Sequence, residues 1–138
     1  MMIMKNKDVI IKKSKIAGRG LYANRDFKKG ENIVIYDGEK VTKKVGDDRF
    51  EEQQKKGLFY VFLLNRKFDI DGEKGTFGKY ANHSCNPNAE SVNYDGKEIW
   101  LEAKKNIKKG EEITYNYNLT GDEPFECKCG NDKCTGKI

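Results

Sequence analysis

Apolar positions along the chain fall into short runs that are separated by polar stretches rich in Gly, Asn and Asp. β-branched and aromatic residues dominate these runs, as is typical of strands, and the residues between them are typical of turns. The pattern predicts a mainly β fold. Its strands are expected at residues 8–13, 31–38, 58–64, 67–71, 97–103 and 112–118.

One segment departs from this pattern and predicts a short helix, at residues 46–57. Asp47 or Asp48 can cap its first turn, because a side-chain oxygen at this place accepts a backbone N–H that lacks a helical partner. Basic residues lie at its end, and Gly57 is suited to terminate it. The helix is therefore expected as a single insert between strands.

Turn signals add two further predictions. Asp95-Gly96 follows residues 89–94 and predicts a hairpin with a tight primed turn. Residues 23–33 and 103–113 share a small residue, a polar linker, one apolar anchor and Lys-Lys-Gly-Glu before a strand. The glycine in each favours a turn conformation that residues with a Cβ resist, so we interpret the likeness as structural.

Length and composition change this picture little. A chain of 138 residues is expected to form one domain. No apolar run approaches the ~20 residues of a membrane span, and the N-terminus lacks a secretory signal, so an intracellular protein is expected. The net charge of +5 comes from 27 Lys and Arg residues against 22 Asp and Glu residues, spread along the chain. Scattered lysines favour a solvated surface, and no direct binding to nucleic acid is expected.

The four cysteines are better candidates for metal ligands or buried thiols than for disulfides in an intracellular chain. Cys127, Cys129 and Cys134 form a dense C-x-C-x4-C pattern near the C-terminus. A structural zinc ion is nearly always held by four protein ligands in a tetrahedral arrangement. The pattern therefore supplies three ligands and leaves the fourth to be found elsewhere in the chain.

A glycine-containing segment is the first candidate for ligand binding. Gly18 and Gly20 flank Arg19 within residues 14–23. Glycines allow a ligand to approach the backbone closely, and a plain turn is the alternative interpretation.

Two further segments carry residues suited to chemistry. Residues 78–91 hold the only histidine, His83, followed by Cys85 and surrounded by asparagines, which predicts an irregular loop held by local hydrogen bonds. A lone histidine is usually structural, and no acid pattern nearby makes this His and Cys a nucleophile pair. Tyr115 and Tyr117 lie two apart on a predicted strand and so face one side, where tyrosines usually belong to a core.

The order of these segments resembles the SET-domain family of protein lysine methyltransferases with its cysteine-rich post-SET tail. The resemblance covers residues 10–136 and implies a SET fold, β-clip-like, of several small sheets with one short inserted helix and a knot-like threading near the C-terminus. A SET domain is then expected at residues 1–124 and a zinc-binding post-SET tail at residues 125–138. The resemblance to this family rests on the motifs GRGLYA, IVIYDGE, YANHSCNPN, GEEITYNY and CKCGNDKCTG.

The resemblance implies an S-adenosylmethionine-dependent protein lysine N-methyltransferase, whose cofactor and target lysine enter from opposite faces. It also implies one structural zinc ion, held by the three tail cysteines with Cys85, the one remaining cysteine, as the fourth ligand. The residues that match the family's cofactor-binding positions are Gly18, Arg19, Gly20, Leu21, Tyr22, Tyr36, Asn82 and His83.

Three tyrosines match the family's catalytic positions. Tyr117 matches its active-site tyrosine, and Tyr60 matches a tyrosine that lines the lysine channel. A channel that excludes water favours the neutral amine, which hydroxyl groups can then orient, so Tyr117 is expected to orient and stabilise, with a general-base role as the alternative. Tyr115 stands where the family carries Phe or Tyr, and a Tyr there implies preferential monomethylation.

Two other functions remain open at this point. A catalytically silent, zinc-stabilised SET module that binds a peptide or protein would not need Tyr60, Tyr117 and the cofactor loop together. A zinc-ribbon binder of nucleic acid would carry paired C-x2-C motifs and a clustered basic face, and the sequence has neither. The expected substrate is a lysine in a basic protein, such as a histone, a histone-like protein or a ribosomal protein.

Overall fold

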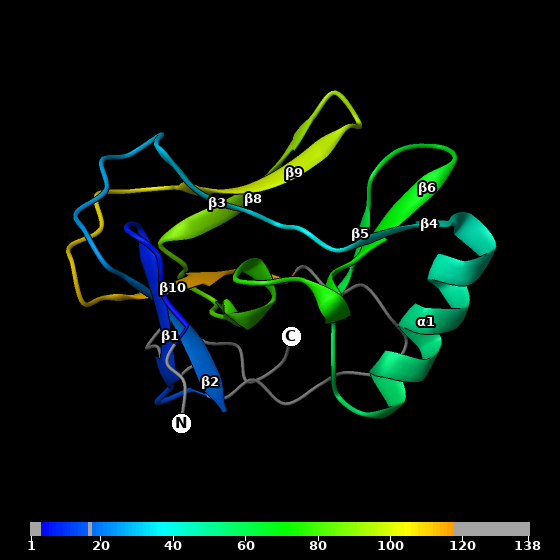
Figure 1. Ribbon diagram of the computed structural model, residues 1–138, viewed down its shortest axis with the longest axis horizontal. Helices are drawn as coiled ribbons and strands as arrows, with labels where there is room; N and C mark the ends of the chain where they lie inside the picture. The colour runs from blue at the N-terminus through cyan, green and yellow to red at the C-terminus, as the bar shows by residue number, and fades with distance from the viewer. Residues whose placement is uncertain (1–3, 17, 118–138) are drawn as a thin grey trace.

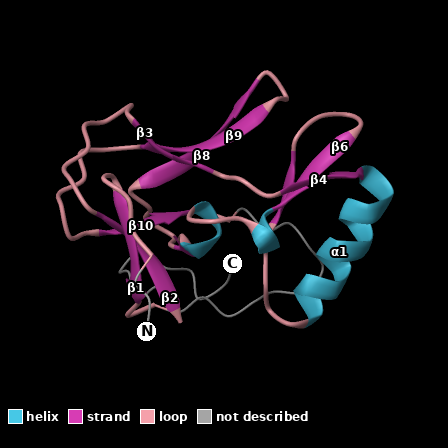
Figure 2. Ribbon diagram, viewed as in Figure 1, coloured by secondary structure: helices cyan, strands magenta, loops and turns pink. Residues whose placement is uncertain are grey.

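The computed structural model describes residues 4–16 and 18–117. These residues form three small sheets and one α-helix, so the predicted mainly β fold is confirmed (Figures 1 and 2). The sheets have the strand orders β1-β2-β10-β7, β3-β9-β8 and β4-β6-β5. The helix α1 packs on β6 and β4 at one end of the molecule, and β10 lies near its centre (Figure 1).

The four-stranded sheet contains β1 (Val9–Lys13), β2 (Arg19–Ala23), β10 (Glu112–Tyr115) and β7 (Asn82–His83). The second sheet contains β3 (Asn32–Ile35), β9 (Glu98–Ala103) and β8 (Ala89–Tyr94). The third contains β4 (Glu39–Thr42), β6 (Phe68–Asp71) and β5 (Val61–Leu63). The helical elements are α1 (Lys43–Lys55) and the 3-10 turns η1 (Gly72–Lys74) and η2 (Gly78–Tyr80).

The helix begins earlier than the sequence predicts. Thr42 caps it by accepting the N–H of the third helical residue at 3.4 Å, so the predicted cap at Asp47 or Asp48 is wrong. Gly46 lies inside the helix, where an added Cβ would collide with the carboxylate of Asp69 on β6. This glycine therefore allows close packing of the helix on the sheet and does not break the helix.

The end of the helix is as predicted. Gly57 follows the C-cap residue, and its N–H donates back to the last turn at 3.0 Å, while the Leu58 N–H donates to Gln53 O at 2.9 Å. This pair of bonds is a Schellman motif. Because the chain is still turning here, β5 begins only at Val61, and the strand predicted at residues 58–64 is shorter than expected. No helix in the described part of the chain has the length and apolar character needed to cross a membrane.

The hairpin prediction is confirmed. β8 and β9 pair antiparallel from Ala89 opposite Ala103 to Tyr94 opposite Glu98. The two residues between them both have positive φ angles, 54° at Asp95 and 68° at Gly96, as a primed turn requires.

The two segments that share Lys-Lys-Gly-Glu bind each other in the fold. Phe27 and Ile107, the apolar anchors, form an antiparallel bridge with both N–H to carbonyl distances at 2.8 Å. Gly30 and Gly110 have φ angles of 92° and 95°, and each donates its N–H to the first residue of the other segment at 2.8 Å. The likeness is therefore structural, as predicted, and the two turns are equivalent partners.

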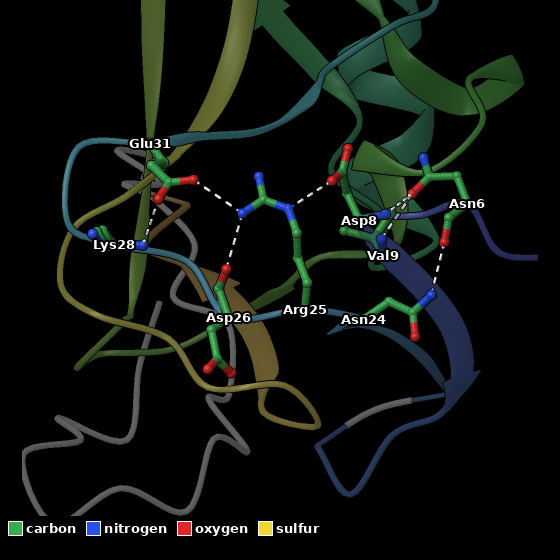
Figure 3. Close-up of polar contacts among 8 residues, drawn as sticks. All are labelled: Asn6, Asp8, Val9, Asn24, Arg25, Asp26, Lys28 and Glu31. Carbon is green, nitrogen blue, oxygen red and sulfur yellow. Dashed lines mark hydrogen bonds and ion pairs between the residues drawn. The ribbon is translucent and has the colours of Figure 1, made fainter.

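A polar network ties the N-terminal segment to the first of these turns. The Arg25 guanidinium lies between the carboxylates of Asp8 (2.7 Å) and Glu31 (3.0 Å) (Figure 3). It also lies 4.0 Å from the centre of the Phe27 ring. The Asn24 side chain donates to the backbone carbonyl of Asn6 at 2.8 Å. The Arg25 side chain is 40% exposed, so the ion pairs orient the turn more than they stabilise the fold.

The apolar interior consists of two clusters, and Phe62 packs against both. Its ring centre lies 4.4 Å from that of Tyr36 in the smaller cluster and 5.9 Å from that of Tyr115 in the larger one. Tyr36 and Tyr115, both predicted to be functional, therefore lie where the two clusters meet. The fully buried members include Val9, Leu21, Phe27, Ile107, Ile113 and Tyr36.

Candidate active site

The Asn-His segment lies beside the strand that carries Tyr115. β7 pairs in parallel with β10, with Asn82 opposite Thr114 and His83 opposite Tyr115. The Ser84 N–H extends this pairing by donating to Tyr115 O at 3.1 Å. Two segments that are distant in the sequence thus form one short piece of sheet at the centre of the molecule (Figure 1).

Asn88 braces the same strand. Its buried side chain accepts the Thr114 N–H at 2.9 Å and donates to Glu112 O at 2.8 Å. One amide therefore bonds the backbone of β10 as a neighbouring strand would. The irregular loop predicted at residues 78–91 is confirmed only for residues 84–88, which are held by side-chain hydrogen bonds. The rest of that range forms η2, β7 and the start of β8, so the prediction is wrong there.

His83 connects this loop to Tyr117. The ring is 6% exposed, and its Nδ1 accepts the Tyr117 N–H at 3.0 Å, which ends β10 before the predicted limit at residue 118. Burial lowers the pKa of His83 and favours the neutral ring. Because Nδ1 is an acceptor, the proton of the neutral ring resides on Nε2, which lies 3.5 Å from Cys85 Sγ.

Tyr115 and Tyr117 lie side by side. Their ring centres are 4.9 Å apart, and the Tyr117 ring also contacts His83 edge-on at 5.3 Å and Phe59 at 6.1 Å. Tyr115 is 3% exposed, whereas Tyr117 is half-buried and packs against the core. The pair, predicted to share a face, forms one wall of an aromatic cluster.

The hydroxyl groups of this pair differ in their partners. The Tyr117 hydroxyl donates to Ala81 O at 2.9 Å, whereas the Tyr115 hydroxyl makes no hydrogen bond within the described ranges 4–16 and 18–117. Burial raises the pKa of both phenols, and neighbouring tyrosines add to the rise. Both therefore remain protonated near neutral pH and act as hydrogen-bond donors.

The backbone of Tyr60 is held from both sides. Its N–H donates to Gln53 Oε1 at 3.1 Å, and its carbonyl accepts the Gly72 N–H and the Tyr36 hydroxyl, both at 2.9 Å. Tyr36 is only 1% exposed, and its hydroxyl bonds directly to the Tyr60 carbonyl. Its contact with a cofactor stays a prediction. Burial raises the pKa of the Tyr60 phenol, with Tyr80 adding to the effect.

The predicted cofactor loop lies at a fork in the four-stranded sheet, where β10 stops pairing with β2 and begins to pair with β7. β10 pairs with β2 only through Tyr22 and Leu21, and its second half pairs with β7. Gly18 and Arg19 are exposed at this fork, and the Asn82 side chain reaches Arg19 O at 3.2 Å. The segment predicted as a loop is therefore mostly strand, with its exposed end facing Asn82.

Glu112 is the residue of this fork that sequence reasoning missed. Its carboxylate accepts hydrogen bonds from Ser14 (2.8 Å), Asn82 (3.1 Å) and the Tyr22 hydroxyl (3.2 Å). It also lies 2.6 Å from where a Cβ on Gly20 would be, which explains the glycine. The repeat offered a signal, since the first copy carries an asparagine where the second carries this glutamate.

Cys85 is half-buried at the end of the Asn-His segment. It lies beside a polar pocket that is also lined by Lys104 and Asn116. The described residues contain no group of three or more potential metal ligands. The other predicted zinc ligands, Cys127, Cys129 and Cys134, and the predicted knot-like threading depend on residues outside the described part of the chain.

A comparison with protein families decides where the chain belongs. The family model described as SET domain matches residues 18–118. The chain belongs to the SET-domain family. The matched residues include both strands of the fork, the Asn-His segment and the tyrosine pair.

Individual relatives agree with this family. The chain is 37% identical over 139 residues to "Variant-silencing SET domain-containing protein" of Plasmodium falciparum. It is 35% identical over 141 residues to "Histone-lysine N-methyltransferase set-2" of Caenorhabditis elegans and 38% identical over 138 residues to "Histone-lysine N-methyltransferase, H3 lysine-36 specific" of Mus musculus. The alignments cover 93%, 97% and 94% of this chain but only 6%, 9% and 5% of these relatives.

Proposed function

We propose that the chain is an S-adenosylmethionine-dependent protein lysine N-methyltransferase. The observation that carries the proposal is the aromatic cluster in which Tyr115 and Tyr117 lie against the Asn82–His83 strand with their phenols desolvated. Membership of the SET-domain family and the names of two relatives, both histone-lysine N-methyltransferases, support the same activity.

The fork between β2 and β7 fits the amino-acid end of such a cofactor. The Arg19 carbonyl and the Glu112 carboxylate provide oxygen atoms for an ammonium group, and the exposed Arg19 side chain provides a cation for a carboxylate. Buried Leu21 and Tyr22 would hold this backbone from within. When bound, the cofactor would supply a methyl group activated by a positively charged sulfur.

The tyrosines would prepare the substrate amine. A lysine amine has a reference pKa of about 10.4 and must lose its proton before it can act as a nucleophile. Walls formed by Tyr60, Tyr115 and Tyr117 would exclude water and disfavour the charged amine. The raised tyrosine pKa values favour orientation of the amine by hydroxyl groups over its deprotonation by a tyrosinate, which would be scarce at neutral pH.

Calorimetry with S-adenosylmethionine, followed by transfer of a labelled methyl group to basic proteins, tests the proposal. We expect binding of one cofactor per chain and label on lysine. Binding or capture of a peptide without cofactor binding would instead support the catalytically silent SET module, and the absence of both would contradict both functions.

The substrate class is proposed to be a lysine in a basic protein, such as a histone, a histone-like protein or a ribosomal protein. Two relatives are histone-lysine N-methyltransferases by name, and this is the ground for the proposal. Incubating the protein with labelled cofactor and a lysate of its source organism should label a small number of basic proteins. Label on acidic proteins alone would contradict the proposed class.

Tyr115 is proposed to favour monomethylation. Its ring is buried between Tyr117 and Phe62, and its hydroxyl, which has no hydrogen bond within residues 4–16 and 18–117, is available to hold the amine or a water beside it. Tyr115→Phe removes this hydroxyl and should shift the product toward dimethyl- and trimethyl-lysine. Mass spectrometry of a methylated peptide measures the shift, and dominant trimethylation by the unaltered protein would contradict the prediction.

We also propose one structural zinc ion held by Cys85, Cys127, Cys129 and Cys134. A four-cysteine site of this kind would fasten residues 125–138 to the segment that carries His83. Removing the metal with a chelator, or changing Cys85 to Ser, should increase proteolysis of this tail and reduce methyl transfer together. Metal analysis verifies the loss of zinc, and full activity after verified loss would refute the coupling.

A further inference from the structure

One polar side chain of α1 is buried although the helix is otherwise polar and largely exposed. Gln53 is 5% exposed, and Gly46 is the other buried residue of this helix. A buried amide is tolerated only when its donors and acceptors are satisfied. The Gln53 side chain meets this need with groups from two other segments, at Asp71 on β6 and at Tyr60 before β5.

Asp71 fixes which way the Gln53 amide points. Its carboxylate is 2% exposed and accepts hydrogen bonds from the Gln53 Nε2 at 2.9 Å, the Arg49 guanidinium at 3.1 Å and the Glu73 N–H at 3.0 Å. A carboxylate only accepts, so the Gln53 amino group must face Asp71 and its oxygen must face the Tyr60 N–H. The ion pair with Arg49 balances the buried charge.

The chain between the helix and Tyr60 is bonded to the same residue. The Gln53 backbone carbonyl accepts the Leu58 N–H at 2.9 Å, and the Gln53 side chain accepts the Tyr60 N–H at 3.1 Å. Tyr60 O is fixed at the same time by the Gly72 N–H and the Tyr36 hydroxyl. Both backbone polar groups of Tyr60 are therefore held by buried partners.

We propose that Gln53 is a positioning residue that sets Tyr60 in the lysine channel, so that α1 determines the shape of the channel wall. The proposal rests on the proposed methyltransferase function, because it assigns a role to the channel tyrosine. Gln53 itself need not touch the substrate; it acts through the backbone N–H of Tyr60. Its loss would let Tyr60 shift and would weaken the placement of the substrate amine without altering the fork at which a cofactor would bind.

The test replaces Gln53 with Met, which has a similar length but cannot accept the Tyr60 N–H or donate to Asp71. We expect kcat/KM for the lysine substrate to fall roughly tenfold, the effect of about one lost net hydrogen bond, with the dissociation constant of S-adenosylmethionine unchanged. The matched control is Gln54→Met, at the neighbouring, half-exposed position of the same helix, which should leave both values unchanged.

A double-mutant cycle with Tyr60→Phe separates positioning from general stability. If Gln53 acts through Tyr60, the loss caused by Gln53→Met should nearly vanish in the Tyr60→Phe background. Additive losses, or a weakened affinity for S-adenosylmethionine, would overturn the proposal. If the unaltered protein binds this cofactor but transfers no methyl group, the proposed function fails at that step, before either variant is compared.

Hydrogen exchange of the unaltered chain supplies a test that does not depend on the folding of a variant. The Tyr60 N–H should exchange as slowly as the interior amides of α1, because its acceptor belongs to that helix. Fast exchange of Tyr60 beside a protected helix would overturn the proposal.

Discussion

Replacing Tyr117 with Phe should lower the rate of methyl transfer by on the order of 100-fold while leaving the affinity for S-adenosylmethionine intact. The phenylalanine keeps the ring contacts with Tyr115, His83 and Phe59, so the shape of the cluster is retained. What it loses is the hydroxyl that donates to Ala81 O at 2.9 Å. That hydroxyl is fixed next to the Asn-His strand and would orient the substrate amine.

Single-turnover kinetics with a lysine peptide and calorimetry with the cofactor measure the two quantities separately. Tyr94→Phe is the matched control, because it removes the same atom from an exposed tyrosine of the β8–β9 hairpin. Full activity of the Tyr117 variant would contradict the assigned role. A loss of cofactor affinity equal to the loss of rate would mean that Tyr117 belongs to the cofactor site instead.

Two substitutions of His83 should differ because each imitates one nitrogen of the ring. Asn places its oxygen near the position of Nδ1 and can still accept the Tyr117 N–H, whereas Gln places its polar group near Nε2 and cannot. A buried N–H that loses its acceptor costs about 1–3 kcal/mol. We therefore expect His83→Gln to reduce methyl transfer roughly tenfold or more relative to His83→Asn, because 1.4 kcal/mol corresponds to a factor of 10.

The measurement is kcat at saturating cofactor for both variants, with thermal unfolding as a check on the fold. Both substitutions keep the β7 backbone, so cofactor binding through that backbone is expected to persist in each. If the Gln variant equals or exceeds the Asn variant, the Tyr117 N–H bond does not control the reaction. In that case the contact of Nε2 with Cys85 would be the more important one.

Local signals in the sequence predicted the elements whose causes are local. The Asp95-Gly96 turn and the paired glycines at positions 30 and 110 have the positive φ angles that their sequences require. The mainly β architecture follows from the β-branched and aromatic runs. The Asn-His-Ser-Cys segment and the tyrosine pair were predicted as one site from a family resemblance. In the structure β7 pairs with β10, which carries Tyr115, and Tyr117 lies just beyond β10 and bonds to His83.

The errors occur where a specific tertiary or side-chain contact overrides the local preference of the sequence. Gly46 resembles a helix boundary in the sequence but lies inside α1. It is a glycine there because Asp69 on β6 leaves no room for a Cβ. The strand predicted at residues 58–64 is shortened because the chain leaving the helix bonds to Gln53. Asp69 is remote from Gly46 in the sequence, whereas Gln53 is close to Tyr60 but holds it through a buried side chain that strand propensity does not describe.

The sequence by itself determined the strand-rich fold and the turns, because strand and turn preferences act within a few residues. The order of its motifs also indicated the set of residues available for chemistry. Only the tertiary structure decided the proton position on His83, the inclusion of Glu112 in the fork and the link from Gln53 to Tyr60. These features are hydrogen bonds that buried or half-buried side chains make with groups of other segments. Their strength depends on burial and on distances of about 3 Å, which folding alone creates.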